Sequence, residues 1–330
     1  MNNFEKYREI PSLLISGKKE KASKKVAIAI TVYRRVNTLK EAIESCLNQT
    51  DFDDYSIVVC DDYPKRDDET EKYVTSLNND KIVYYKNEHN LGATPNWNRC
   101  FEVCGTEYIV LLHDDDLLFQ NYLSQVFRVL AKHPDADLIV PEHIVWNQNS
   151  KVSKPQQSDD KRYPLYRMTT AKCAFMNNYP SGILYRTKAV LDMGGFDENL
   201  WPACDWYFYA QAIENKVVYR YDKPLYIYRY YENVSFKEEV QKAYLKQDAD
   251  LLKYLTHSSK FLKPFSNIIV SARTNVRLWS FRKMFGRNID EKDLTGIPYV
   301  RNKFISYLYI ALSKSIGKIC FLDTFWGEKL

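Results

Sequence analysis

Short apolar segments alternate with helix-like segments between Val26 and Leu112. The apolar segments read VAIAITVY, YSIVVC, KIVYY and YIVLL, and the stretches between them have the spacing of amphipathic helices. Apolar runs that alternate with helices in this way are typical of βαβ units, in which parallel strands are buried on both faces. We therefore predict an α/β fold with a mainly parallel central sheet flanked by helices.

Polar clusters follow three of these predicted strands. The strands run into TVYRR, CDDYP and LHDDD. In parallel sheets the carboxyl ends of the strands meet at one rim, where ligands bind. We therefore expect the three clusters to lie together and to form the functional site.

The third cluster, His113 followed by Asp114, Asp115 and Asp116, has the highest density of negative charge. Adjacent carboxylates repel one another unless a cation or a proton intervenes. The cluster therefore predicts a metal site, and oxygen ligands of this kind suit Mg²⁺ or Mn²⁺. Asp116 could instead cap a following helix.

The composition indicates a globular protein that is kept in a reducing compartment. The 330 residues are 45% hydrophobic and 27% charged, which excludes collagen-like and wholly disordered chains. The seven cysteines are odd in number and contain no paired CxxC knuckle, so we expect reduced thiols and a cytoplasmic location. Residues 1–24 lack an apolar run of signal-peptide length and are expected to form a basic, flexible lead-in or a short docking segment.

The basic character of the chain is concentrated in its C-terminal part. The net charge is +5, and residues 241–330 hold 16 Lys and Arg against 7 Asp and Glu, which leaves the first 240 residues at −4. This region is expected to be helical, and its charge either marks a solvated face or attracts phosphates on a membrane surface or an acceptor. FISYLYIAL, residues 304–312, is too short to span a bilayer and predicts either an interfacial amphipathic helix or a core-facing one.

Four segments of the chain closely resemble the family 2 glycosyltransferases. They begin at VAIAITVYRRVNT, YSIVVCDDYP, NLGATPNWNRC and PSGILYRTKAVLDMGGFDENLWPACDW, in the order and spacing of that family, and the resemblance covers about residues 25–235. It implies a GT-A (Rossmann-like) domain over residues 25–236, with a donor half at 25–118 and an acceptor half at 119–236. A basic helical region would follow at 237–330. The resemblance also implies inverting transfer from a nucleotide-activated sugar.

The resemblance assigns the aspartate cluster to the metal and the donor diphosphate. Asp114 and Asp116 form a literal DxD pair, but alignment with the common LDSDD form puts His113 at the first Asp and Asp115 at the last DxD position. Asp115 is the preferred metal ligand, and Asp114 would face ribose or metal. Asp116 and His113 are the further candidates.

The resemblance also implies donor contacts at the ends of the first two strands and in the NLGATPN segment. The residues concerned are Thr31, Tyr33, Arg35, Asp61, Asp62, Asn90, Gly92 and Asn96. Tyr33 would stack on the base and Asp61 or Asp62 would accept its N–H group, whereas Arg34 or Arg35 would approach the diphosphate. Alternatively, Tyr33 is a core residue, Asp62 forms a turn, and Asn96 is a helix N-cap.

On the acceptor side, Asp205 occupies the position of the family's catalytic base, with Cys204 in place of the frequent Glu. Inverting transfer needs such a base to remove the proton of the acceptor hydroxyl. Asp205 could equally be a helix N-cap. The further candidates for acceptor or sugar contact are Trp201, Trp206, Gly182 and Arg229.

We expect a non-processive enzyme, because the Q-x-x-R-W segment of processive synthases and membrane spans are both absent from the sequence. It would move one sugar, from a UDP-sugar foremost, to a glycan or lipid-linked acceptor, with peripheral membrane contact through the C-terminal region and no nucleic-acid partner. A sugar nucleotidyltransferase would carry a glycine-rich loop that ITVYRRVNT lacks. A catalytically inactive nucleotide-sugar-binding module would have no need of Asp205.

Overall fold

The computed structural model describes residues 2–18, 24–147, 153–157, 163–175, 181–230 and 237–319. The strands are β1 (Ser12–Ser16), β2 (Val26–Val32), β3 (Tyr55–Asp61), β4 (Ile82–Asn87), β5 (Tyr108–His113), β6 (Leu117–Leu118), β7 (Leu138–Asn147), β8 (Leu165–Arg167), β9 (Ile183–Arg186) and β10 (Val218–Tyr230). The helices are α1 (Val36–Leu47), α2 (Glu69–Ser76), α3 (Ala93–Val103), α4 (Tyr122–Lys132), α5 (Thr170–Cys173), α6 (Thr187–Asp192), α7 (Cys204–Asn215), α8 (Glu238–Ser258), α9 (Ser266–Phe285) and α10 (Lys303–Ile319).

The strands form one mixed sheet in the order β1-β4-β3-β2-β5-β9-β7-β10-β6, and β8 pairs with β10. Its centre, β4-β3-β2-β5, is parallel throughout. β9 is antiparallel to both β5 and β7, so it joins this parallel centre to the second half of the sheet. The predicted α/β fold is confirmed, because the four apolar segments of the sequence are the four central strands.

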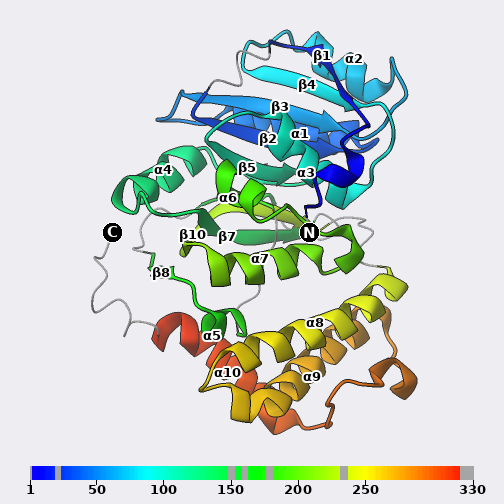
Figure 1. Ribbon diagram of the computed structural model, residues 1–330, viewed down its shortest axis with the longest axis vertical. Helices are drawn as coiled ribbons and strands as arrows, with labels where there is room; N and C mark the ends of the chain where they lie inside the picture. Colours follow the sequence, from blue (N-terminus) through cyan, green and yellow to red (C-terminus); the bar gives the residue numbers. More distant parts are fainter. Residues whose placement is uncertain are drawn as a thin grey trace.

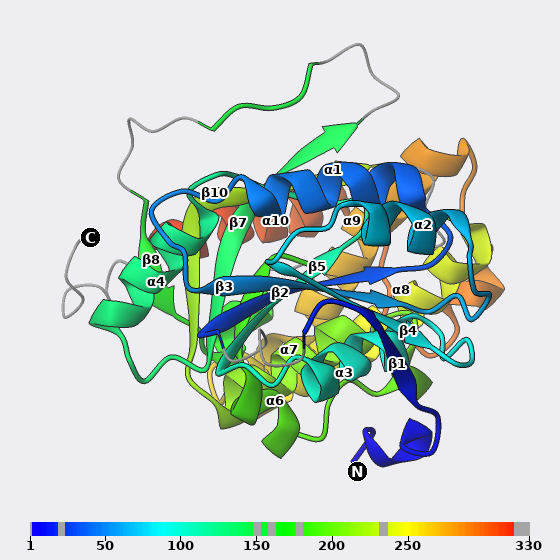
Figure 2. The same cartoon turned by 90° about the horizontal axis from the view of Figure 1, so that it is seen from above.

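Helices cover both faces of the parallel strands, which explains their continuous apolar sequences. Val26, Ile28 and Ile30 of β2 pack in the same cluster as the apolar side of α1, and the alternate residues Ala27 and Ala29 pack in the cluster that contains α3. Figure 2 shows α1 and α2 on one side of these strands and α3 on the other. Side chains of a strand point alternately to its two faces, so both sets must be apolar here.

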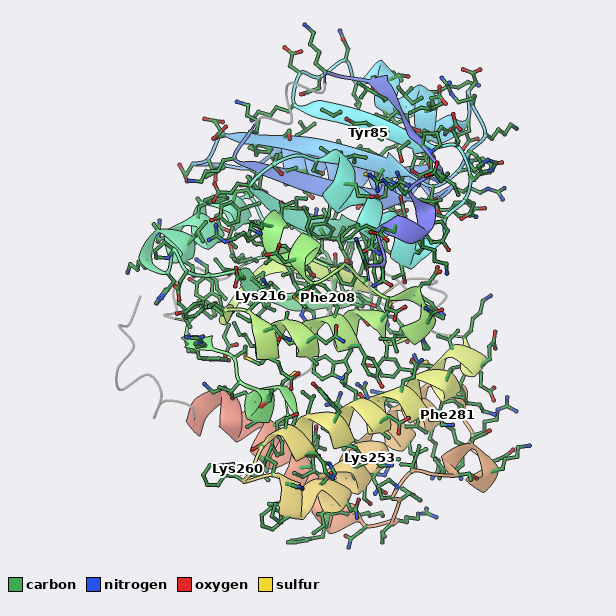
Figure 3. All side chains as sticks on the ribbon, in the orientation of Figure 1. Tyr85, Phe208, Lys216, Lys253, Lys260 and Phe281 are labelled. Atoms are coloured by element: carbon green, nitrogen blue, oxygen red, sulfur yellow. The ribbon has the colours of Figure 1, made fainter. Side chains whose placement is uncertain are left out.

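The helix α7 lies across the second half of the sheet, between the sheet and the C-terminal helices (Figure 1). Phe208 of α7, labelled in Figure 3, stacks on Phe196 with 4.2 Å between ring centroids, and both are buried. This aromatic packing fixes the helix against the sheet. Its first turn is thereby held in place, which matters because Asp205 lies there.

The N-terminal segment differs from the flexible lead-in that the sequence predicts. β1 pairs antiparallel with β4 and forms the edge of the sheet. Before it, Arg99 of α3 donates hydrogen bonds from Nη2 to the carbonyl oxygens of Tyr7 and Ile10, at 2.9 and 2.8 Å. Residues 2–18 are therefore part of the folded domain, and their backbone is held by both the sheet and a helix.

The predicted helical C-terminal region is confirmed over residues 237–319. α8, α9 and α10 pack below α7, at the end of the molecule opposite β1 and β4 (Figure 1). Arg273 of α9 makes two hydrogen bonds of 2.7 Å to buried Asp248 of α8, and its Nη1 donates to the hydroxyl oxygen of Tyr309 on α10 at 3.1 Å. Within the described residues, every helix is too short or too polar to cross a membrane.

Candidate active site

The carboxyl ends of β2, β3 and β5 lie side by side. Thr31, near the end of β2, pairs with Cys60 on one side and with His113 on the other. The three polar clusters of the sequence therefore meet at one rim of the sheet, as predicted.

Arg35 lies over the aspartate cluster at the start of α1. Its guanidinium group donates to both carboxylate oxygens of Asp114, at 2.5 and 3.1 Å, and to Oδ2 of Asp115 at 2.8 Å. Burial raises the pKa of Asp114 to about 7, against the attraction of Arg35. The side chain of Arg35 is 39% exposed, so the group that neutralises the buried carboxylates faces the solvent.

Asp116 lies deepest in the cluster. Its Oδ1 accepts a hydrogen bond of 2.9 Å from the backbone N–H group of Arg229, whereas its buried Oδ2 has no partner among the described residues. Burial raises the pKa of this carboxyl group. The next helix starts at Tyr122 with Asn121 as N-cap, so the alternative reading of Asp116 as a helix cap is wrong.

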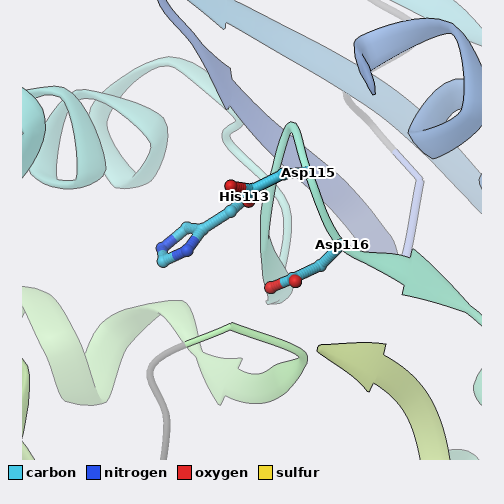
Figure 4. A group of neighbouring side chains, drawn as sticks. All are labelled: His113, Asp115 and Asp116. Carbon is cyan, nitrogen blue, oxygen red and sulfur yellow. The ribbon is translucent and has the colours of Figure 1, made fainter. Parts of the chain in front are cut away.

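His113, Asp115 and Asp116 could together hold a metal ion. One ligand atom from each lies within 4.8 Å of the other two, and Figure 4 shows the three side chains around a common space. The Nε2 atom of His113 is buried and has no partner in the described part of the chain. Asp114 is not in this group, which favours the register with Asp115 over a literal Asp114 and Asp116 pair.

The donor set fits a divalent cation. Burial lowers the pKa of His113, which favours the neutral imidazole that a metal requires. The ring stacks on Trp97 of α3, with centroids 5.4 Å apart and planes inclined by 15°. Two carboxylates suit Mg²⁺ and Mn²⁺ equally, and the imidazole nitrogen favours Mn²⁺.

Tyr33 lies at the rim and is 42% exposed, so it is not a core residue. It contacts Tyr63 edge-to-face, with centroids 5.7 Å apart, and the guanidinium group of Arg34 lies 5.0 Å from the Tyr63 ring. Tyr63 is not among the predicted site residues, although its place directly after the Asp61-Asp62 pair was the available signal in the sequence.

Asp61 and Asp62 both hold the polypeptide around the rim. Asp61 accepts hydrogen bonds from Tyr84 Oη at 2.6 Å and from Lys86 Nζ at 2.8 Å, and is fully buried. Oδ1 of Asp62 accepts from the N–H group of Leu91 and the side chain of Asn87, and Oδ2 from the N–H group of Gly92, each at 2.8 Å. Asp62 therefore forms the predicted turn. Among the described residues, its Oδ2 accepts one hydrogen bond, from Gly92, which leaves a lone pair for a further donor.

The segment that Asp62 holds leads into α3. Gly92 is the N-cap position of that helix and has φ of 92°, a conformation that favours glycine. Asn96 is buried inside the first turn and donates from Nδ2 to the carbonyl oxygen of Cys60 at 3.1 Å, so its reading as an N-cap is wrong. Asn90 is exposed, and its Oδ1 accepts from the Gly92 N–H group at 3.0 Å.

Asp205 lies in the first turn of α7, where Ala203 and not Asp205 is the N-cap residue. Its Oδ1 is buried without a hydrogen-bond partner among the described residues. Burial raises its pKa to about 6, and the backbone N–H groups of Trp206 and of Asp205 itself, together with the charge of Arg277, oppose that rise. A carboxylate in this environment is a stronger base than an ordinary aspartate, whose pKa is about 4.

The first turn of α3 connects Asp205 to the aspartate cluster. Thr94 Oγ1 lies 3.2 Å from Sγ of Cys204, the residue before Asp205. One turn further along α3, Trp97 stacks on His113. The candidate base and the candidate metal ligands therefore border the same part of α3, although they are far apart in the sequence.

Two of the residues predicted to contact the acceptor, Trp206 and Gly182, lie in close packing in the structure. Trp206 is 2% exposed and is enclosed between Tyr209, which it stacks on, and the guanidinium group of Arg273. Gly182 has φ of 69°, and a Cβ atom there would lie 2.6 Å from the ring of Tyr226, so the glycine permits close packing and offers no group to a ligand.

Arg229 and Trp201 have different surroundings. The guanidinium group of Arg229 is buried, pairs with Glu41 at 3.0 and 3.1 Å and lies 5.5 Å from the ring of Trp146. It is therefore enclosed and paired in this structure, and its predicted contact with the acceptor or sugar stays a prediction. Trp201 is 40% exposed beside α7 and is the remaining aromatic candidate for a sugar ring.

Residues 27–194 match a family model whose description is "Glycosyl transferase family 2". An uncharacterized glycosyltransferase of Methanocaldococcus jannaschii is 25% identical over 198 residues, which are 60% of this chain and 67% of that protein. The GalNAc(5)-diNAcBac-PP-undecaprenol beta-1,3-glucosyltransferase of Campylobacter jejuni is 32% identical over 107 residues, 32% of this chain and 34% of that protein. The matches therefore span from about a third to two thirds of these relatives' own length.

Solved structures of two other proteins have a fold similar to that of this chain. S. aureus TarS residues 1–349, in complex with UDP-GlcNAc, aligns with a TM-score of 0.57 at 15% identity and covers 91% of this chain and 92% of that one. A mannosyltransferase from Pyrobaculum calidifontis, in complex with GDP-Man and Mn²⁺, aligns with a TM-score of 0.52 at 12% identity over 97% and 92% of the two chains. The fold is that of the GT-A glycosyltransferases. The chain belongs to glycosyltransferase family 2.

Proposed function

We propose that this protein is an inverting, metal-dependent glycosyltransferase that moves a single sugar from a nucleoside diphosphate donor to a hydroxyl group. The observation that carries the proposal is the buried Oδ1 of Asp205, which has no hydrogen-bond partner among the described residues. The preceding residue, Cys204, contacts Thr94 of α3, the helix whose Trp97 stacks on His113. A base and a cation site on either side of one cleavable bond are the requirements of inverting transfer. A binding module would need only the cation and nucleotide groups.

In this proposal the donor half, residues 25–118, holds the nucleotide. Tyr33 stacks on the base with its exposed ring, and Oδ2 of Asp62 accepts the N–H group of a uracil-type base with its free lone pair. Asp114 faces the ribose, and Thr31, Asn90, Gly92 and Asn96 shape the surrounding wall. A UDP-sugar is the donor that these groups favour, and the UDP-GlcNAc complex of TarS, a protein of similar fold, supports a nucleotide-sugar ligand.

The diphosphate binds next to the aspartate cluster. His113, Asp115 and Asp116 would hold Mn²⁺ or Mg²⁺, which neutralises charge on the diphosphate as it leaves. Arg35 is partly exposed and bridges Asp114 and Asp115, so its guanidinium group would be within reach of a diphosphate at the cluster and would add positive charge there. The Mn²⁺ in the mannosyltransferase structure supports a divalent ion in this fold.

In the acceptor half, residues 119–236, Asp205 accepts the proton of the attacking hydroxyl through Oδ1, which has no partner in the described part of the chain. The hydroxyl oxygen then attacks the anomeric carbon on the side opposite the departing diphosphate. Trp201 offers an exposed indole face to a sugar ring. The name of the C. jejuni glucosyltransferase gives an undecaprenol-linked glycan as its acceptor. This relative supports a lipid-linked or polysaccharide acceptor, in a surface glycan pathway, for the present protein.

A donor screen tests this function. Purified protein with Mn²⁺ or Mg²⁺ is incubated with UDP-, GDP- and dTDP-sugars, and release of nucleoside diphosphate is measured. We expect metal-dependent turnover of one donor, with water as a slow acceptor. Binding of a donor without turnover, even in the presence of glycolipid acceptors, would instead indicate an inactive binding module.

The activity should fall as the pH falls through about 6, because Asp205 must be ionised to accept a proton. An aspartate with an ordinary pKa would keep the enzyme active down to about pH 4. The profile of kcat/KM against pH at saturating metal checks this expectation. An acidic limb centred near pH 4 would contradict the raised pKa of the base.

We also propose that the C-terminal region contacts the inner face of the cell membrane. The helix α10 turns an apolar face outwards, in which Phe304 is 74%, Tyr307 63% and Leu308 49% exposed. The basic residues Arg301 and Lys303 lie at its start and are exposed. An amphipathic helix with this pattern suits an anionic lipid surface.

Liposome co-sedimentation tests the membrane contact. Binding to vesicles that contain phosphatidylglycerol should fall about tenfold or more in the double variant Phe304→Ser and Leu308→Ser. Each of these apolar side chains would contribute about 1.5 to 3 kcal/mol to binding when it is buried in the membrane. Leu191→Ser is the matched control, since Leu191 is 44% exposed on α6. Equal binding of the double variant and the wild type would rule the surface out.

A further inference from the structure

The C-terminal helices build one wall beside the candidate base. Gln247 of α8 accepts a hydrogen bond from the N–H group of Ala203 at 3.1 Å and donates to the carbonyl oxygen of Trp201 at 2.8 Å. These contacts tie α8 to the loop that enters the first turn of α7. Helix α8 therefore packs beside the turn that carries Asp205.

Arg277 of α9 is the cationic group in this wall. It makes long hydrogen bonds, 3.4 Å to each carboxylate oxygen of Asp248 and 3.3 Å to the hydroxyl oxygen of Tyr244, and its guanidinium carbon lies 5.0 Å from the Tyr244 ring. The side chain is 28% exposed. Its Nη1 atom makes no hydrogen bond to any residue that the structure describes.

The ion pair with Asp248 does not account for Arg277. Arg273 already makes two hydrogen bonds of 2.7 Å to Asp248, so that carboxylate is neutralised without a second guanidinium group. Two arginines therefore share one acidic partner in α8. The arginine with the longer bonds is also the one that reaches the solvent, which leaves it free to pair with a second anion.

Arg277 also acts on the candidate base. Burial raises the pKa of Asp205, and the positive charge of Arg277 opposes that rise. Burial raises the pKa of Tyr244 as well; Arg277 opposes this rise, and the charges of Asp248 and Asp205 add to it. The guanidinium carbon of Arg273, one turn before Arg277 on α9, lies 5.5 Å from the ring of Trp206, the residue after Asp205. Arg277, which donates to Tyr244 of α8, therefore lies on the part of α9 that packs against the first turn of α7.

We propose that Arg277 and Tyr244 form an anion subsite that holds a phosphate group of the acceptor beside Asp205. This inference rests on the proposed function, because it places the acceptor next to the base of that reaction. A guanidinium group binds phosphate through two parallel N–H groups, and a tyrosine hydroxyl adds a third donor. The acceptor hydroxyl then donates to Oδ1 of Asp205, while the phosphate fixes which hydroxyl does so.

The phosphate can belong to a phosphodiester in a glycan chain or to the diphosphate of a lipid-linked acceptor. Both present the same group to Arg277 and differ in the chain that follows it. The subsite therefore selects acceptors that carry a phosphate group, whereas the contacts around it select the glycan or the lipid attached to that phosphate.

Calorimetric titration measures the subsite directly. The protein is first saturated with Mg²⁺ and the nucleoside diphosphate of its donor, so that the donor phosphate site is filled. The probes are a glycerol phosphate trimer for the phosphodiester and geranylgeranyl diphosphate in micelles for the lipid, with triglycerol as the neutral counterpart. We expect one phosphate probe to bind and triglycerol not to bind.

Three variants identify the residue that binds the phosphate. Arg277→Gln should weaken binding of the phosphate probe about tenfold or more, the usual effect of a lost charge-assisted hydrogen bond, and Arg277→Lys should restore part of it. Arg282→Gln, an exposed arginine on the same helix, is the matched control and should bind like the wild type. Gln241→Glu, one turn before Tyr244 on α8, adds a negative charge without removing Arg277 and should also weaken binding.

The outcomes separate this inference from the proposed function. If the protein binds the nucleotide but binds neither phosphate probe, or if Arg277→Gln and Gln241→Glu both bind the probe like the wild type, the subsite is refuted and the function stands. If no nucleoside diphosphate binds in the presence of metal, the proposed function itself fails. Melting temperatures of all variants show whether they are folded.

Discussion

Replacement of Asp205 by Asn should lower the rate of sugar transfer by about 10² to 10⁴-fold, the usual contribution of a general base. The amide has nearly the same shape as the carboxylate but cannot accept the proton of the attacking hydroxyl. Donor affinity should change little, because the candidate nucleotide groups lie on β2, β3, α3 and the loop after β5. Release of nucleoside diphosphate measures the rate, and calorimetric titration of the donor measures affinity.

Asp250→Asn is the matched control for this experiment. Asp250 is exposed on α8, and its nearest cationic partner, Lys253 Nζ, is 4.0 Å away. Its replacement should leave the rate at the wild-type level. A variant at Asp205 that kept more than a tenth of the wild-type rate would remove Asp205 as the base.

Replacement of Asp115 by Asn should weaken binding of Mn²⁺ and lower the rate at a fixed metal concentration by about 100-fold or more, since a bound cation contributes several kcal/mol to stabilisation of the leaving group. Asp115 is in the three-residue group with His113 and Asp116, and Asp114 is not. Asp114→Asn should therefore affect Mn²⁺ binding less. Electron paramagnetic resonance of free Mn²⁺ measures binding without any turnover.

This pair of variants also decides which register of the HDDD sequence binds the metal. A larger loss of Mn²⁺ affinity in Asp114→Asn than in Asp115→Asn would favour the literal pair Asp114 and Asp116. Equal affinity in the wild type and both variants would exclude the cluster as the metal site. Equal affinity would also mean that Arg35 remains the partner of Asp114 and Asp115 throughout the reaction.

The centre of the fold could be predicted because local sequence determines it. Strands buried on both faces need continuous apolar residues, and β2 to β5 have them. The edge strand β1 was missed because SLLIS is short and only partly buried, so its strand structure depends on pairing with the distant β4. Local pattern carries no information on such a partner.

The same limit applies to the candidate site. The rim residues were predicted because strand ends mark them, whereas the surroundings of Trp206 depend on α9, which brings Arg273 over its indole ring. Arg277 was missed for the same reason, because nothing near it in the sequence indicates that α9 lies beside Asp205. Asp62 combines both cases: its place at the rim was predictable, but its bonds to the N–H groups of Leu91 and Gly92 were not.

The stereochemistry of the reaction shows whether Asp205 acts as the base of an inverting transfer. Proton nuclear magnetic resonance can follow hydrolysis of the preferred donor and identify the sugar anomer that forms first, before mutarotation. A base at Asp205 that activates water opposite the leaving diphosphate predicts the inverted anomer, for example β-sugar from an α-linked donor, and predicts that Asp205→Asn slows its formation by about 10² to 10⁴-fold. First formation of the retained anomer would contradict the account.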